Sequence, residues 1–118
     1  MEKRGVFAEK SNWNILKLLK IRASEYGNRE FIKFDSGSAL SFKSLDESSD
    51  KMACKLLNIG LKEDENVFCL LKNSPEFLVS LFAVMKTGAV FVPINTELRG
   101  QFLEHQYLNC EPKVAIID

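Results

Sequence analysis

The sequence is poor in the residue types that build metal centres, disulfide frameworks and nucleophile–base pairs. It contains one histidine and three cysteines in 118 residues. The cysteines Cys54, Cys69 and Cys110 are far apart and form no C-x-x-C pair, which argues against structural zinc and against a disulfide framework. We therefore expect free thiols in a reducing cytoplasm. The single histidine, His105, has polar neighbours and is expected on the solvated side of a helix.

The chain also lacks an excess of charge of either sign. Its 16 basic and 16 acidic residues cancel, so no electrostatic footprint for nucleic acid or an anionic membrane is present. The charged start is not followed by the apolar segment of a signal peptide. Lys86-Thr87-Gly88 interrupts the longest apolar run, residues 77–94, which predicts a buried helix and a buried strand and no transmembrane segment. We expect a soluble cytoplasmic protein.

Sequence motifs for phosphate binding and nucleophilic catalysis are absent as well. The chain contains no G-x-x-x-x-G-K-[ST], no G-x-G-x-x-G and no G-x-S-x-G, so neither a phosphate-binding loop nor a nucleophile elbow is predicted. No catalytic residue, no metal ligand and no tightly bound cofactor is therefore expected within these residues.

The first half of the chain has the pattern of a helix followed by a hairpin. Asn12 can cap a helix that reaches about residue 26, with Gly27 as the stop. The short β-like runs 31–34 and 39–42 flank a turn sequence and predict a β-hairpin.

A second helix is expected from Lys43 to Asn58, ended by Gly60. Ser44 and Glu47 have the spacing of a capping box at its start. Helical periodicity places an inner stripe at Leu45, Ser49, Met52, Ala53, Leu56 and Ile59.

The second half alternates apolar strands with helices. Ser74-Pro75-Glu76 is a strong helix start and Gly88 a strong stop. Alternation with short connections predicts right-handed crossovers and a parallel sheet. The expected elements are buried strands at 66–71, 90–93 and 113–117 and helices at 75–86 and 99–110. The fold class is α/β, a layered, mostly parallel sheet flanked by helices, with an N-terminal helix and hairpin.

Candidate ligand contacts are the segments that follow the carboxyl ends of these strands, where open α/β sheets bind ligands. They are Lys72-Asn73-Ser74, the loop from Pro93 to Gly100, and Asp118. The first can hold an anion or simply cap the helix. Arg99 in the second can pair with a phosphate or lie on the surface. The acidic turn 63–65 lies at the opposite end of the sheet.

Several segments occur in the order typical of one enzyme family: Ser41-Phe42-Lys43-Ser44-Leu45, residues 56–62 with the strand from Val67, Asn73-Ser74-Pro75-Glu76-Phe77, Lys86-Thr87-Gly88-Ala89-Val90, Val92-Pro93-Ile94-Asn95, and Leu98-Arg99-Gly100 with Leu103 and Tyr107 before Lys113. Together they resemble the start of the acyl-CoA synthetase, or AMP-binding, family. The resemblance runs from about Trp13 to Asp118. The 73–77 and 92–95 segments look closest to carnitine/crotonobetaine- and fatty-acyl-CoA ligases.

The resemblance implies an AMP-forming ligase that joins a carboxylic acid to AMP, releases pyrophosphate and passes the acyl group to CoA, with ATP, Mg²⁺ and CoA as cofactors. The phosphate loop, the ribose-binding acid and the catalytic lysine of that family lie beyond Asp118. Residues 1–118 would thus be the N-terminal portion of the adenylation domain, with no second domain. This portion would be an incomplete subdomain, inactive alone, whose partner is the remainder of the ligase.

Site residues carried over from the family are few. In some relatives an arginine in the loop after Val-Pro-x-Asn contacts the CoA phosphate. Glu97 occupies the matching position here, so Arg99, two residues later, is the candidate contact. Glu65 stands where the family usually has aspartate, which affects the turn before the strand.

Two alternatives stay open at this point. One is a stand-alone α/β module that binds a partner protein or a nucleotide. The other is a small hydrolase or redox enzyme, which no nucleophile–base set or dithiol supports. For the ligase fragment, an unpaired sheet edge after Ile117 also predicts self-association.

Overall fold

The computed structural model describes residues 14–118. The chain divides into two compact units, Met1–Glu47 and Ser48–Asp118. The expected cap Asn12 and the charged start of the chain lie outside the described residues. Within the described part, every helix is too short or too polar to cross a bilayer.

The first unit begins with α2 (Ile15–Tyr26). Its cap is Asn14, whose Oδ1 accepts hydrogen bonds from the backbone N–H of Leu16 at 2.9 Å and of Lys17 at 3.2 Å. The prediction of Asn12 was therefore wrong by two residues, because both asparagines precede the same apolar stripe and either fits a cap. The helix ends at Tyr26 as expected, but Gly27 keeps right-handed backbone angles (φ −39°, ψ −47°) and is no left-handed cap.

The hairpin is confirmed. The strands β1 (Glu30–Lys33) and β2 (Ala39–Ser41) pair antiparallel, and the turn is closed by Gly37 N–H bonding to Phe34 O at 2.9 Å. The helix α3 (Phe42–Asn58) follows without a break. Ser41 caps it, because Ser41 Oγ accepts from Ser44 N–H at 3.0 Å. The predicted Ser44–Glu47 capping box was wrong, since the helix starts before Ser44.

The inner stripe of α3 is correct except at its end. Leu45 and Ser49 are fully buried, and Ala53 and Leu56 are buried as well. Ile59, by contrast, is 68% exposed. The helix ends at Asn58, and Gly60 with φ +100° turns the chain away, so Ile59 no longer follows helical periodicity.

The second unit contains the sheet. Its strands are β3 (Asn66–Leu70), β4 (Val90–Pro93) and β5 (Val114–Ile117), and their order is β4-β3-β5. Both pairings are parallel, with Val67 opposite Phe91 on one side and opposite Val114 on the other. The predicted parallel sheet is confirmed.

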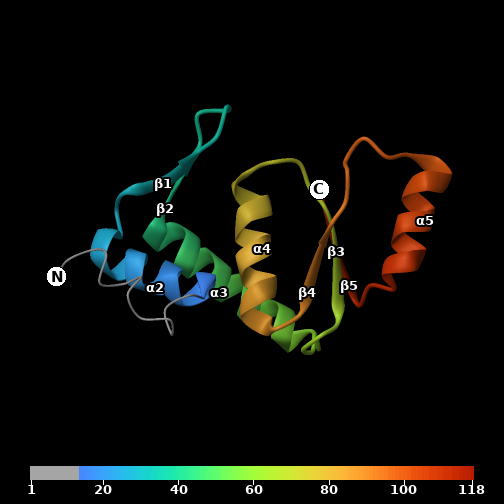
Figure 1. Ribbon diagram of the computed structural model, residues 1–118, viewed down its shortest axis with the longest axis horizontal. Helices are drawn as coiled ribbons and strands as arrows, with labels where there is room; N and C mark the ends of the chain where they lie inside the picture. Colours follow the sequence, from blue (N-terminus) through green and yellow to red (C-terminus); the bar gives the residue numbers. More distant parts are fainter. Residues whose placement is uncertain (1–13) are drawn as a thin grey trace. The chain divides into compact units, whose positions relative to one another are not determined.

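Two helices, α4 (Pro75–Thr87) and α5 (Gly100–Cys110), cover opposite faces of this sheet (Figure 1). Val67 lies in a core with Ala83 and Val84 of α4 and Ala53 and Leu56 of α3. The next residue of β3, Phe68, points to the other face, because side chains alternate along a strand. There its ring meets Tyr107 of α5 edge-on, at 5.2 Å between ring centres.

The ends of α4 match the sequence prediction. Ser74 Oγ accepts from Phe77 N–H at 3.2 Å, and Pro75 occupies the first turn. Gly88 ends the helix in the left-handed conformation, with φ +82°. A side chain there is disfavoured twice, because an added Cβ would also lie 3.1 Å from Cγ of Glu63.

Burial of all three strands on both faces was predicted, and this holds only for β3. Val90 of β4 is 44% exposed and Ile117 of β5 is 60% exposed. Each of these strands has a neighbour on one side only, and α5 covers the sheet incompletely. Periodicity showed that the strands are apolar, but it carries no information on which strand lies at the centre.

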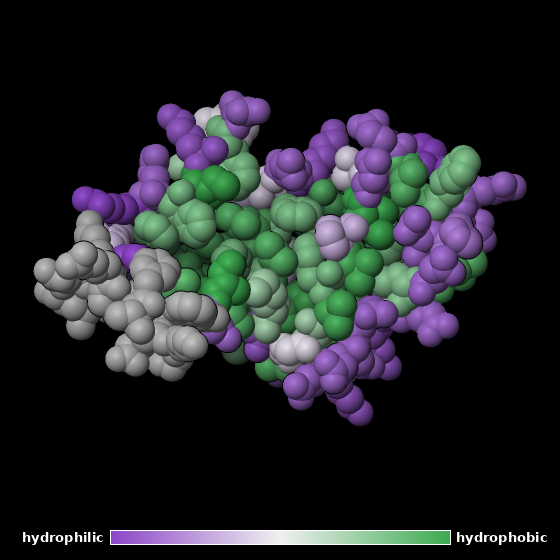
Figure 2. Space-filling model, viewed as in Figure 1, coloured by the Kyte–Doolittle hydropathy of each residue, from purple (hydrophilic) through white to green (hydrophobic). Residues whose placement is uncertain are grey.

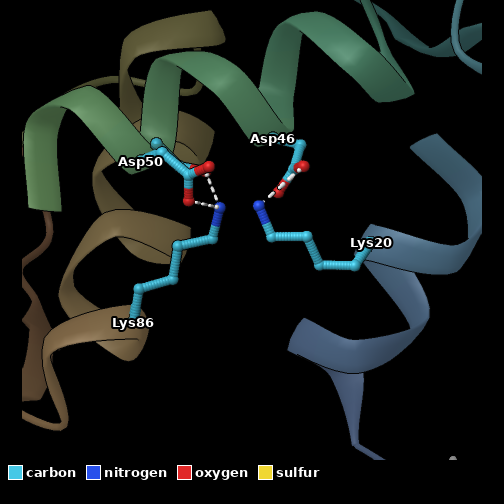
Figure 3. Close-up of polar contacts among 5 residues, drawn as sticks. Lys20, Asp46, Asp50 and Lys86 are labelled. Atoms are coloured by element: carbon cyan, nitrogen blue, oxygen red, sulfur yellow. Dashed lines mark hydrogen bonds and ion pairs between the residues drawn. The ribbon is translucent and has the colours of Figure 1, made fainter. Parts of the chain in front are cut away.

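A buried cation joins α3 to α4 within the second unit. Lys86 Nζ donates to Ser49 Oγ at 2.8 Å and to Asp50 Oδ1 at 2.7 Å (Figure 3). The Lys86 side chain is only 10% exposed, whereas that of Asp50 is 47% exposed. In the first unit Lys20 Nζ lies 3.0 Å from Asp46 Oδ2, with the lysine side chain 54% exposed.

These two pairs should differ in their contribution to stability. We expect Lys86→Ala to lower the free energy of unfolding by about 1–3 kcal/mol, because it takes a charged partner from the buried Ser49 hydroxyl. The matched change Lys20→Ala should cost less than about 1 kcal/mol, since that lysine is half exposed. Urea denaturation of both variants measures the difference, and equal losses would contradict this assignment.

Candidate functional site

The carboxyl ends of β3 and β4 open into a groove of about 640 Å³. Parallel neighbours end at the same edge of a sheet, so the segments after the two strands meet there. The structure thus brings together two of the three candidate segments. The groove is lined by Leu71, Lys72, Asn73, Phe77, Pro93, Ile94, Asn95, Thr96 and Glu97.

The apolar part of the groove is continuous with the packing of α4 on the sheet. Phe77 lines the groove and also meets Phe91 of β4 edge-on, with ring centres 5.5 Å apart and planes at 85°. Ile94 N–H bonds to Cys69 O at 2.9 Å, which extends the pairing of β4 with β3 into the groove. Figure 2 shows apolar side chains gathered over α4 and the adjoining strands, with polar side chains over the loops beyond their carboxyl ends.

One polar wall is the segment between β3 and α4. Ser74 Oγ donates to the carbonyl of Lys72 at 2.9 Å and accepts from Phe77 N–H. Because Ser74 already occupies this N–H group, the helix start is capped from within. The exposed Lys72 contributes the positive charge of this wall.

The other polar wall is the loop after β4. Asn95 Oδ1 accepts from Glu97 N–H at 2.9 Å, and Asn95 O accepts from Leu98 N–H at 3.2 Å. Asparagine folds the loop in this way because its short side chain can mimic a backbone turn. The side chain and the backbone of Asn95 together therefore close this turn.

Arg99 lies behind this loop and is not among the residues that line the groove. Its Nη1 donates to Thr96 O at 2.6 Å and to Leu98 O at 2.8 Å. Arg99 is also the residue before α5, where its side chain makes no capping bond to the helix. The sequence predicted either a phosphate contact or a surface position for this arginine, and it did not indicate the bonds to the loop. A turn asparagine four residues before an arginine is a weak signal for such a loop.

Other candidate residues lie away from the groove. His105 is exposed on α5, with its Nε2 3.1 Å from Asn109 Nδ2. The acidic turn is structural, since Glu65 Oε1 accepts from Lys62 N–H at 2.6 Å and Asp64 has a left-handed φ of +66°. Asp118 follows β5, is exposed, and does not line the groove.

A second hollow, of about 490 Å³, belongs to the first unit. Its lining includes Lys20 and Lys43 but also Asp46 and Glu47, so its charges cancel. Lys20 is already paired with Asp46. Its lining includes none of the segments that follow β3, β4 or β5, and it is the weaker candidate.

The groove is better suited to binding than to chemistry. It combines an apolar floor with amide side chains, one exposed cation, Lys72, and one exposed carboxylate, Glu97, and it holds no histidine or cysteine side chain. Thr96 has the only hydroxyl in its lining, and no histidine lies among the lining residues to activate it. This composition suits an amphipathic small molecule.

A family model for the AMP-binding enzymes matches residues 19–118. The chain belongs to the AMP-binding enzyme family. This match includes every element of the second unit and therefore both walls of the groove.

Curated relatives of this AMP-binding chain include CoA ligases and a surfactin synthase subunit. It is 34% identical over 89 residues to a crotonobetaine/carnitine–CoA ligase of Citrobacter koseri, with 72% of this chain covered. It is 30% identical over 97 residues to the medium/long-chain-fatty-acid–CoA ligase FadD6 of Mycobacterium tuberculosis, with 82% covered. It is 26% identical over 102 residues to surfactin synthase subunit 1 of Bacillus subtilis, with 86% covered.

Solved structures share the fold. The anthranilate CoA ligase AuaEII, in complex with anthranoyl-AMP, superimposes with a TM-score of 0.81 at 24% identity over 89% of this chain. The N-terminal domain of FACL13 from Mycobacterium tuberculosis gives a TM-score of 0.79 at 26% identity over 88%. The chain spans 20% and 26% of those two structures, and 17%, 16% and 3% of the curated relatives in the order given.

The three thiols of the chain are free, as predicted, and differ in accessibility. Cys54 is exposed, whereas Cys69 and Cys110 are buried. Burial raises the pKa of both Cys69 and Cys110 above their ordinary value of 9.0. Cys69 lies in β3 directly below the groove, so its accessibility reports on the groove end of the sheet.

We expect iodoacetamide at pH 8 to modify Cys54 first and the two buried thiols only in urea, as measured by mass spectrometry. Because the raised pKa values favour the neutral thiols in the folded state, stability should be unaffected below pH 9 and should fall as the pH rises above it. Rapid labelling of Cys69 in the folded protein would contradict the packing described.

Proposed function

We propose that this chain is part of an ATP-dependent acid–thiol ligase that activates a carboxylic acid as an acyl-AMP and transfers the acyl group to CoA. Family membership supports the adenylate-forming class. Several relatives that are at least 30% identical over most of this chain are named as CoA ligases, which supports CoA as the acceptor. Their names also favour a fatty acid or a betaine-type acid as substrate, which would place the enzyme in fatty acid or carnitine metabolism.

The main support for the proposal is that both walls of the groove come from segments that belong to the family pattern. The groove lining comes from two segments, 71–77 and 93–97, and these overlap the Asn-Ser-Pro-Glu-Phe and Val-Pro-Ile-Asn segments of the family pattern. Residues far apart in the chain thus converge because β3 and β4 are parallel neighbours. In the proposed enzyme, residues 1–118 form one wall of the acyl and CoA sites, and the remainder of the ligase is their partner.

The cofactors of the proposed reaction are ATP, Mg²⁺ and CoA. The described residues offer contacts that suit CoA better than Mg²⁺ or the ATP phosphates. No three acidic, histidine or cysteine side chains within residues 14–118 converge as metal ligands, and Glu97 is the only carboxylate in the groove. Mg²⁺ and the ATP phosphates are therefore assigned to other parts of the enzyme. CoA fits better, because Lys72 and Arg99 place two cations around the groove.

Arg99 is the proposed contact for a CoA phosphate. Its side chain is exposed, and guanidinium binds phosphate through two parallel N–H groups. In the described part of the chain, its Nε and Nη2 make no hydrogen bond, whereas Nη1 makes two. The Nε–Nη2 edge is therefore available for a bidentate contact.

The proposal can be tested by comparing this chain with the product of its complete reading frame. We expect the 118-residue protein to release no pyrophosphate from ATP with CoA and a panel of fatty and betaine-type acids, because its groove holds no histidine, no cysteine and no cluster of metal ligands among the described residues. A longer product should release pyrophosphate with at least one acid. Turnover by the 118-residue protein, or a stop codon directly after Asp118, would instead favour a stand-alone module.

Self-association through one sheet edge is also proposed. Val90 N–H bonds to Glu65 O, directly before β3, and Ile94 N–H bonds to Cys69 O of β3. Because bonding alternates along a strand, the backbone nitrogens of residues 91 and 93 point away from β3. Pro93 has no N–H group, so the β4 edge offers one hydrogen-bond donor fewer to a second copy. Lys113 N–H likewise bonds to β3, so Val114 and Ile116 present their N–H groups outward from β5. Within the described strands, β5 is the edge open to a second copy.

Concentration-dependent dimerisation should therefore depend on β5. We expect Ile117→Lys to weaken the dimer about tenfold, because an edge lysine opposes strand pairing. The matched change Val90→Lys, on the β4 edge, should leave the affinity of the dimer unaltered. Light scattering across a concentration series measures both, and a strict monomer for the parent chain would contradict the proposal.

A further inference from the structure

Two residues, Asn95 and Arg99, bond to several backbone groups of the loop 94–99. The N–H group of Glu97 bonds to the Asn95 side chain, and that of Leu98 bonds to Asn95 O. The carbonyl groups of Thr96 and Leu98 bond to Arg99 Nη1. Asn95 thus accepts hydrogen bonds from two N–H groups of the loop, and Arg99 donates to two of its carbonyl groups.

These bonds decide the shape of the groove. Asn95, Thr96 and Glu97 form one wall of it, and all three are in the segment that Asn95 and Arg99 close. A loop of this length without such bonds would sample several conformations, because backbone ordering costs about 1–2 kcal/mol per residue. Hydrogen bonds from a charged donor to carbonyls are strong enough to offset part of that cost.

We propose that Arg99 is a positioning residue of the groove. Its Nη1 holds the 94–99 wall in place through the bonds to Thr96 O and Leu98 O, which we call the latch, and its Nε–Nη2 edge is left for the ligand phosphate. The phosphate half of this statement rests on the proposed function, whereas the latch stands on the hydrogen bonds alone. Both roles use one guanidinium, because its two edges point in different directions. A lysine could serve only one of them at a time.

The latch has a readout that does not need a ligand. We expect Arg99→Ala to raise the amide hydrogen exchange of Glu97 and Leu98 about tenfold in the 118-residue protein, since it removes two charge-assisted bonds from their loop. Adding ethylguanidinium should restore protection, and Arg99→Lys should restore little of it. The matched change Lys72→Gln, on the opposite wall, should leave these amides unaltered.

The phosphate contact has a separate readout. CoA and dephospho-CoA differ by the 3′-phosphate, and NMR titration of the parent chain should show CoA binding several-fold more tightly. This preference should disappear in Arg99→Ala and weaken in Arg99→Lys. Lys72→Gln should lower the affinity for both ligands alike.

The two sets of results separate the proposals. Unchanged exchange of Glu97 and Leu98 in Arg99→Ala, or no rescue by ethylguanidinium, would overturn the latch even if CoA still binds. Equal affinity of the parent chain for CoA and dephospho-CoA would overturn the phosphate contact while leaving the latch in place.

Discussion

The parallel pairing of β3 with both of its neighbours is the constraint on which the second unit depends. It buries Val67 and Phe68 on opposite faces, so α3 and α4 must cover one face and α5 the other. It also brings the carboxyl ends of β3 and β4 to one edge, which is the sole reason why residues 71–77 and 93–97 line one groove. The apolar floor of the groove is the upper end of the same packing, since Phe77 contacts Phe91 of β4. Stability and site geometry therefore have a common origin in this unit.

Much of this architecture follows from local sequence signals. Ser74, Pro75 and Gly88 each have one strongly preferred backbone role, so both ends of α4 were predictable. The predictions failed where several residues satisfy the same local rule. Asn12 and Asn14 both precede the first apolar stripe, and Ser41 and Ser44 both precede acceptable first turns. The strands were recognisable as apolar runs, but which of them is central depends on pairing, and that information is not local.

The candidate site likewise divides into features that local sequence signals predicted and features that depend on the three-dimensional path of the chain. The sequence placed Lys72 and the 93–100 loop at carboxyl strand ends, and topology then brought them together. It could not show that Arg99 bonds to two carbonyls of its own loop, because such bonds depend on the path of the loop in space. Nor could it show that Lys86 reaches the buried Ser49 on another helix. A lysine within an otherwise apolar helix is a signal for a buried partner, but it does not identify which one.

The composition of the groove also limits what this wall can contribute to catalysis. An interaction accelerates the chemical step only if it is stronger in the transition state than with bound substrate. The groove residues lie in loops around an apolar floor, and their potentially reactive groups are limited to the Glu97 carboxylate and the Thr96 hydroxyl. A phosphate held at Arg99 would be far along the CoA molecule from the reacting thiol, and its binding would change little as the acyl group is transferred. In the proposed ligase, this part of the chain therefore supplies uniform binding, and changes at Arg99 should alter the Michaelis constant for CoA more than the turnover number.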